Sequence, residues 1–277
     1  MTSPKKPGVK GLVDELLSAF DSSLHRGKLL VAAMTGVGLG AFLLLDEWLR
    51  VQPGDALHIA CRCLAVLALI GVLALGICLL TQMTFIEMSR RRPATRDEIR
   101  AGLLGNVLRL ALDLALLVGV LGGLLALFRW LPGRVNVEAG WLNETLQSLL
   151  LTLRLLLEVI VWPVFALALL LLGPIVVIEE TSAFGALRAW LAILRQHLGR
   201  IYLYEALALA IAGVLTLPLL IPIALASGAA HSHFAERATL QVLAGVACTP
   251  MLAYIFVANV FIYLNLRYEF QHQRSVK

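Results

Sequence analysis

The sequence predicts an all-α integral membrane protein, a polytopic helical bundle of about six transmembrane helices with amphipathic elbow helices at the membrane interface. Of its 277 residues, 60% are hydrophobic and only 15% are charged. An ordinary soluble domain is about half apolar and a quarter charged, so too few polar side chains remain here to cover a water-facing surface. The apolar residues also gather in six runs of about the length that a bilayer span needs, roughly 20 residues.

The six apolar runs are residues 29–45, 63–80, 111–128, 155–178, 203–227 and 240–264. The tails and loops that remain are too short to hold a folded catalytic domain, so we expect a protein without enzymatic activity or cofactor. We divide the chain into a cytoplasmic amphipathic N-terminal segment (1–28), a six-span transmembrane domain (29–265) and a cytoplasmic C-terminal tail (266–277). Because polar residues dominate the first segment, we expect no cleavable signal peptide.

The basic residues that flank the apolar runs are distributed unevenly between the two sides of the predicted membrane. The two tails and the second and fourth loops carry 16 lysines and arginines, whereas the alternate loops carry five. The positive-inside rule therefore places both termini in the cytoplasm, in agreement with an even number of spans. The net charge of +5 is explained by this topology. No soluble surface interleaves basic and aromatic residues, so we expect no nucleic-acid partner.

The N-terminal segment carries apolar residues at helical spacing, with acidic residues opposite them. The apolar set is Val13, Leu16, Leu17, Phe20 and Leu24. Such a helix either lies on the membrane surface or packs on loops of the same chain, and the pattern fits both arrangements.

The second and fourth loops resemble one another, and both are predicted to be cytoplasmic elbows. In the second loop, Arg90, Arg91 and Arg92 precede Thr95 and Glu98, which have the spacing of a capping box. The apolar positions 99, 103 and 110 recur at 187, 191 and 198, a constant offset of 88 residues. This match indicates either a duplicated unit or the chance agreement of two helical patterns.

The second elbow has the clearer amphipathic pattern. Its apolar residues fall within an arc of about 80° on a helical projection, with Arg188 and Arg195 at one border; the arc holds Phe184, Leu187, Leu191, Leu194 and Leu198. A helix of this kind lies in the headgroup plane with its arginines reaching lipid phosphates, or it packs on the bundle and uses them for orientation only.

The segment 174–200 resembles the membrane domain found in glycerophosphodiester phosphodiesterases and in related stand-alone bacterial membrane proteins. The matching residues are Glu179 at the end of a span, the set Ala186, Leu187, Arg188 and Trp190, and Tyr263, Leu266 and Arg267 near the C-terminus. The sequence departs from the pattern at Ala189, often serine, and at Asn265, often aspartate. The resemblance implies a bacterial inner-membrane protein without activity of its own, since the catalytic barrel of that family is absent.

Two pairs of opposite charges lie inside or near the predicted spans. Arg109 and Asp113 are four residues apart in the third span, and Arg154 and Glu158 repeat this spacing in the fourth. Opposite charges at that separation lie on one face of a helix and partly neutralise each other. The two pairs either mark the ends of a polar route for an ion or headgroup, or stabilise the helices at the interfaces.

Other residues suggest packing rather than chemistry. His58, Cys61 and Cys63, together with His231 and His233, match no established metal motif, so we expect no metal site. Gly36 and Gly40 form a small-xxx-small pair suited to a close helix contact, internal or with another subunit. We expect a similar packing role for Gly119, Gly122 and Gly123.

These observations favour a non-catalytic scaffold or accessory subunit that organises lipid or a partner protein. The residues expected to contact headgroups or the partner are Arg90, Arg91, Arg92, Arg188 and Arg195. Membrane lipids are the expected partners, together with a second membrane protein or a further copy of the chain. The alternative is a small transporter or channel-like protein whose polar route includes Arg109, Asp113, Arg154 and Glu158.

Overall fold

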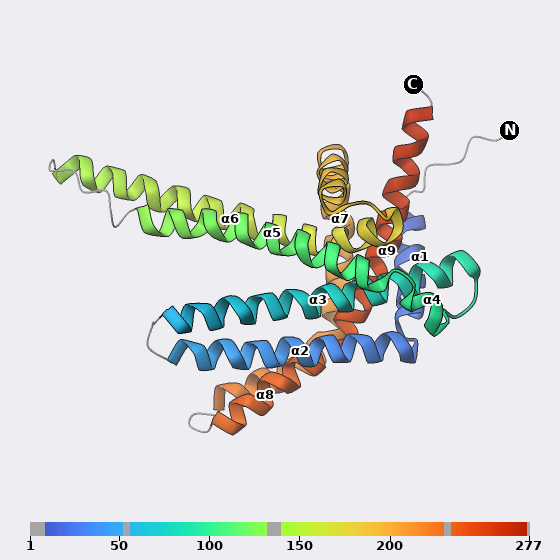
Figure 1. Cartoon of the computed structure of the whole chain (residues 1–277), viewed down its shortest axis with the longest axis horizontal. Coiled ribbons are helices and arrows are strands. Elements are labelled where there is room, and N and C mark those ends of the chain that lie inside the picture. The colour runs from blue at the N-terminus through green and yellow to red at the C-terminus, as the bar shows by residue number, and fades with distance from the viewer. Residues whose placement is uncertain (1–8, 52–55, 132–139, 230–233, 276–277) are drawn as a thin grey trace.

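The computed structural model describes residues 9–51, 56–131, 140–229 and 234–275 and consists of helices throughout, with no strand in these ranges (Figure 1). The helices are α1 (Val9–Ser23), α2 (Arg26–Val51), α3 (Ala56–Arg90), α4 (Arg96–Arg100), α5 (Leu103–Trp130), α6 (Gly140–Glu179), α7 (Ala183–Ala229), α8 (Phe234–Ala247) and α9 (Thr249–Ser275). The predicted all-α fold class is confirmed.

Six helical segments of the described residues are long and apolar enough to cross a membrane, as the sequence predicted. They are Arg26–Leu49, Leu57–Arg90, Leu103–Trp130, Leu142–Glu179, Ala183–Ser227 and Ala238–Arg267. Each contains one of the six apolar runs and extends beyond it, because the polar residues beside a run continue the same helix. The C-terminal residues 266–275, expected as a separate tail, likewise belong to α9.

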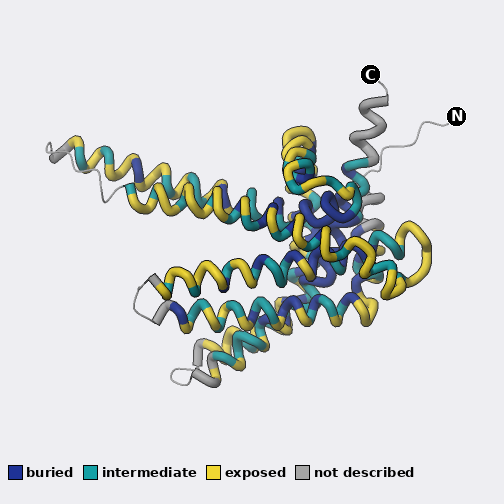
Figure 2. The backbone as a smooth tube through the Cα atoms, viewed as in Figure 1, coloured by how far each residue is buried: buried dark blue, intermediate teal, exposed yellow. Residues whose placement is uncertain are grey.

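Helices α2 and α3 form one hairpin, α5 and α6 form a second, and the two hairpins meet at one junction. Figure 1 shows α2 beside α3 and α5 beside α6, with the two hairpins diverging away from the junction. Helix α9 lies at the junction and contacts α1, α2, α3, α6 and α7. Figure 2 shows the buried residues concentrated there, whereas the far half of the α5–α6 hairpin is largely exposed. In a membrane, that exposed apolar surface faces lipid.

Glycines allow α2 and α8 to approach closely. A Cβ atom added to Gly36 would lie 2.2 Å from the carbonyl oxygen of Gly245, and one added to Gly40 would lie 2.8 Å from that of Gln241. The predicted small-xxx-small contact is therefore internal to the chain. Gly119, Gly122 and Gly123 make no such contact within the described residues, because an added Cβ atom at each would meet no atom within 4 Å. A contact of these glycines with another subunit stays a prediction.

Helix α1 packs on the bundle. Leu16 and Ala19 are buried, and the Phe20 ring meets Tyr254 of α9 edge-on at a centroid distance of 6.3 Å. Leu17 and Leu24 remain exposed on the other side. Of the two arrangements open for this segment, the structure has the packed one, while Val13 has no described side chain.

The two elbows differ in structure, although their apolar positions match at a constant offset. The first contains only the five-residue α4, which ends at Arg100 and is capped by Ala101 before Gly102 adopts a φ of +74°. The second is a continuous helix from Ala183 to a kink at His197, where φ is −126° and ψ is 21°. Residue 103 therefore begins a span, whereas residue 191 lies within the elbow.

The sixth apolar run is divided between α8 and α9 near Pro250. Proline has no amide hydrogen and its ring crowds the carbonyl four residues earlier, that of Val246. The hydroxyl of Thr249 donates to this carbonyl at 2.6 Å. This side-chain bond satisfies the acceptor that the proline leaves free.

Candidate functional site

The two arginine-rich elbows lie at the same end of the bundle, beside α1 and α9. The first elbow is the connection between α3 and α5, and the second is the connection after α6 together with the first part of α7. Arg109, in the second turn of α5, donates to the carbonyl oxygens of Glu180 and Thr181, at 3.2 and 3.4 Å, and so ties the start of α5 to the second connection. Lys28 at the start of α2 pairs with Glu87 near the end of α3 at 2.6 Å. We call this region, residues 85–109 and 177–200, the basic end.

The first connection is organised by Glu98. Its carboxylate accepts from the Thr95 amide at 3.0 Å and from the Thr95 hydroxyl at 2.8 Å, so the expected capping box is present. It also pairs with Arg90 and with Arg92. These hydrogen bonds, first from Thr95 and then from Arg92, with the charge of Arg90, lower the pKa of Glu98 to about 2. Arg91 is exposed, with a φ of 51°.

The Glu98 clamp gives the first elbow a defined pH dependence. Because the pKa of Glu98 in the folded protein lies below its usual value, the stability that its ionised carboxylate gives the elbow is fully present above about pH 4.5. This stability is lost as the pH falls toward 2. We expect Glu98→Gln to make amide hydrogen exchange of residues 95–101 about two- to fivefold faster at pH 7. Asp97→Asn on the same helix is the matched control, and equal exchange in the two variants would contradict this role.

Arg109 and Asp113 do not form the predicted pair. The Arg109 guanidinium instead reaches the connection between α6 and α7, where it donates to the carbonyl oxygens of Glu180 and Thr181. Asp113 lies one turn further along α5 and is fully buried, and neither carboxylate oxygen has a hydrogen-bond partner among the described residues. Four-residue spacing made the pair possible, but carbonyl acceptors in the connection between α6 and α7 compete for the arginine.

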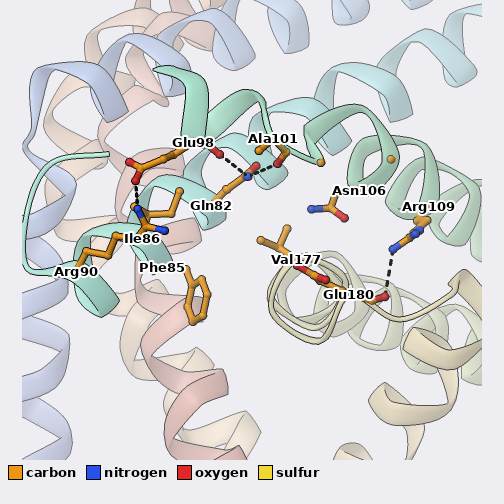
Figure 3. A pocket seen from close by; sticks show the side chains of 12 residues that line it. Gln82, Phe85, Ile86, Arg90, Glu98, Ala101, Asn106, Arg109, Val177 and Glu180 are labelled. Atoms are coloured by element: carbon orange, nitrogen blue, oxygen red, sulfur yellow. Dashed lines mark hydrogen bonds and ion pairs between the residues drawn. The ribbon is translucent and has the colours of Figure 1, made fainter. Parts of the chain in front are cut away.

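A pocket of about 460 Å³ lies at the basic end, between α3, α4, α5 and the last turn of α6 (Figure 3). Its polar lining residues are Gln82, Arg90, Glu98, Asn106, Arg109 and Glu180, and its apolar ones include Phe85, Ile86 and Val177. A volume of this size is in the range of small-molecule sites. The pocket therefore combines charged walls with an apolar floor.

The second elbow presents three different faces. Ala186, Trp190 and Ile193 are buried against the bundle. Phe184, Leu191 and Leu198 of the predicted apolar arc are exposed, and Arg188 and Arg195 are exposed beside that arc. The bundle thus covers a face that the sequence pattern did not single out. Leu187 and Leu194 of the arc are half-buried against the core, and the rest of the arc stays exposed.

Three of the residues that carry the resemblance meet in space. The Tyr263 hydroxyl of α9 hydrogen-bonds to the Glu179 carboxylate at the end of α6, although the two lie 84 residues apart. Arg267 lies 3.7 Å from the same carboxylate and 3.5 Å from the Tyr263 oxygen. This cluster fixes the end of α6, from which the second elbow departs.

The second predicted pair lies at the far end of the α5–α6 hairpin. Arg154 donates to Glu158 at 3.1 Å, and Arg129 of α5 approaches the same carboxylate at 3.5 Å. Arg129 also lines a second pocket, of about 450 Å³, together with Asp46 and Arg62. Arg109 and this group thus occupy opposite ends, and neither pocket is lined by Asp113.

Sequence reasoning missed two buried polar residues, Gln82 and Asn106, which lie on the wall of the first pocket. Glu205, a charge near the start of the fifth apolar run, is almost fully buried in α7. The only signal in the sequence for these residues was a polar side chain within or beside an apolar run. Among the described residues, no three His, Cys, Asp or Glu side chains lie close enough to hold a metal. His231 and His233 fall outside the described residues.

Searches of protein-family models, of curated proteins and of solved structures returned no match for this chain.

Proposed function

We propose that the chain is a non-catalytic, multi-pass protein of the bacterial inner membrane, with both termini cytoplasmic, that organises phospholipid or a partner protein as a scaffold or accessory subunit. One observation carries the proposal: both arginine-rich connections meet at one end, where exposed leucines and exposed arginines lie side by side on the second elbow. Leucines at the acyl boundary and arginines at headgroup level suit an anionic membrane surface.

The resemblance to the membrane domain of the phosphodiesterase type is part of this proposal. The contact of Glu179 with Tyr263 and Arg267 gives three of the matching residues a common structural role. Such a role explains why these residue types belong together in one pattern. It supports a shared fold and adds no activity.

Removing the two elbow arginines is expected to weaken the binding of anionic lipid. Each basic residue near an anionic surface contributes about 1 kcal/mol, so Arg188→Gln with Arg195→Gln costs about 30-fold in affinity at low salt. Native mass spectrometry with added phosphatidylglycerol measures this loss. Arg62→Gln with Arg129→Gln removes two exposed arginines from the opposite end and is the control. Unchanged lipid binding in the elbow variant would refute the role.

A transporter is the second candidate, and Asp113 is the observation in its favour. A fully buried carboxylate without a partner inside an apolar helix is costly, and such residues often serve ion or proton pathways. Reconstituted protein would then conduct ions or protons, and Asp113→Asn would abolish the flux. No flux in the parent protein would remove this candidate. Arg109 and the Arg154–Glu158 pair lie at opposite ends of the molecule and do not converge on one interior cavity, which favours the scaffold.

A further inference from the structure

The pocket at the basic end has a balanced set of charges. Arg90 and Glu98 lie on one side of it and Arg109 and Glu180 on the other (Figure 3). Arg90 is held by Glu98, whereas the guanidinium of Arg109 is bound through one nitrogen only, to main-chain carbonyls. The Glu180 side chain is exposed and forms no ion pair with the described residues. A site for a simple anion would carry an excess of positive charge, which this pocket lacks.

The pocket also offers acceptors in need of a donor. Gln82 donates its amide hydrogens to the carbonyls of Ala101 and Glu98, at 2.9 and 3.2 Å, which leaves its Oε1 buried without a donor. Asn106 is 8% exposed, faces Gln82 across the pocket in Figure 3, and forms no side-chain hydrogen bond within the described residues. Together with the Glu180 carboxylate, these oxygens suit a group with several N–H donors.

A row of exposed leucines runs along α5, the helix that also carries Gly105, Asn106 and Arg109 of the pocket lining. Leu104, Leu108 and Leu112 are all exposed and follow one another at four-residue spacing, so they form one row on the helix. Gly102 and Gly105 stand at the pocket edge with open space where a side chain would be. A ligand seated in the pocket can therefore extend an acyl chain along this row.

We propose that the pocket binds the headgroup of a phospholipid that bears a primary ammonium, as in phosphatidylethanolamine. The ammonium meets the Glu180 carboxylate and the Asn106 amide oxygen, and the phosphate meets the free N–H groups of Arg109. This inference rests on the proposed lipid-organising function and names the lipid class of its pocket. The leucine row favours a membrane lipid over a soluble compound with the same headgroup.

A methylation series tests the proposal directly. Purified full-length protein in detergent is titrated with phosphatidylethanolamine, its N-methyl and N,N-dimethyl forms, and phosphatidylcholine, which carry progressively fewer N–H donors. We expect the apparent affinity to fall at least about tenfold across the series, the equivalent of one charged hydrogen bond. Glu180→Gln, an exposed and conservative change, and Asn106→Leu should each remove the preference. Arg188→Gln with Arg195→Gln should keep it.

Each outcome separates this inference from the proposed function. Equal binding of all four lipids, with phosphatidylglycerol still bound through the elbow, overturns the headgroup assignment and leaves the lipid-organising role standing. A preference that persists in both pocket variants overturns the assignment as well. Soluble phosphoethanolamine that displaces the lipid at similar concentration overturns the choice of a lipid ligand. No binding of any phospholipid contradicts both proposals.

Discussion

Replacing Gly36 by leucine is expected to separate α2 from α8 and to destabilise the protein by at least about 3 kcal/mol. Overpacking a tight contact costs 1–3 kcal/mol where side chains can adjust, and here the atom that a new Cβ meets is a backbone carbonyl oxygen at 2.2 Å. Main-chain atoms of two helices cannot rotate out of the way. Thermal unfolding of the purified protein in detergent measures the effect.

Gly119→Leu is the matched control for this prediction. It makes the same change in a membrane-length helix, but no atom lies within 4 Å of the added Cβ. Leucine also has a higher helix propensity than glycine, so the control should be neutral or slightly stabilising. If the two variants unfold at the same temperature, the close contact between α2 and α8 is absent in solution.

The second large effect is expected at the ion pair between Lys28 and Glu87. The Lys28 side chain is fully buried, its Nζ lies 2.6 Å from the Glu87 carboxylate, and it donates to the Ser22 hydroxyl at 2.6 Å. Glu87→Gln leaves this ammonium buried without its counter-charge, which costs about 3–5 kcal/mol. Denaturant or thermal unfolding in detergent measures the loss.

A double-mutant cycle shows whether the cost comes from the unpaired charge. Replacing both partners by methionine removes the charge and fills a similar volume, so Lys28→Met with Glu87→Met should recover most of the stability lost in Glu87→Gln. If the double variant is as unstable as the single one, the residues act through packing alone.

The apolar runs predicted the number and position of the spans because length and composition are local properties of the chain. Their ends were less predictable. Polar residues such as Glu87 and Arg90 continue α3 beyond its apolar run, since a helix end depends on capping and not on hydropathy. The capping box at Thr95 and Glu98 was predicted from spacing because both halves of that motif lie within four residues.

Contacts between distant segments were beyond the sequence pattern. Gly36 and Gly40 indicated a close contact but not its partner, because any helix with a small residue could have supplied it. For Arg109, the spacing to Asp113 was correct, but the competing carbonyls at 180 and 181 lie in a connection about 70 residues further along the chain. The buried face of the second elbow, with Trp190, was missed because the leucine arc dominated the projection.

The central claim is that the basic end faces the cytoplasm, and cysteine accessibility in intact cells tests it most directly. In a chain whose native cysteines are replaced by alanine, Gln196→Cys places a thiol on the second elbow and Gln147→Cys places one at the far end of α6, both at exposed positions. A membrane-impermeant maleimide should label position 147 in intact spheroplasts and position 196 only after permeabilisation. Labelling of position 196 in intact spheroplasts, with position 147 protected, would contradict the claim.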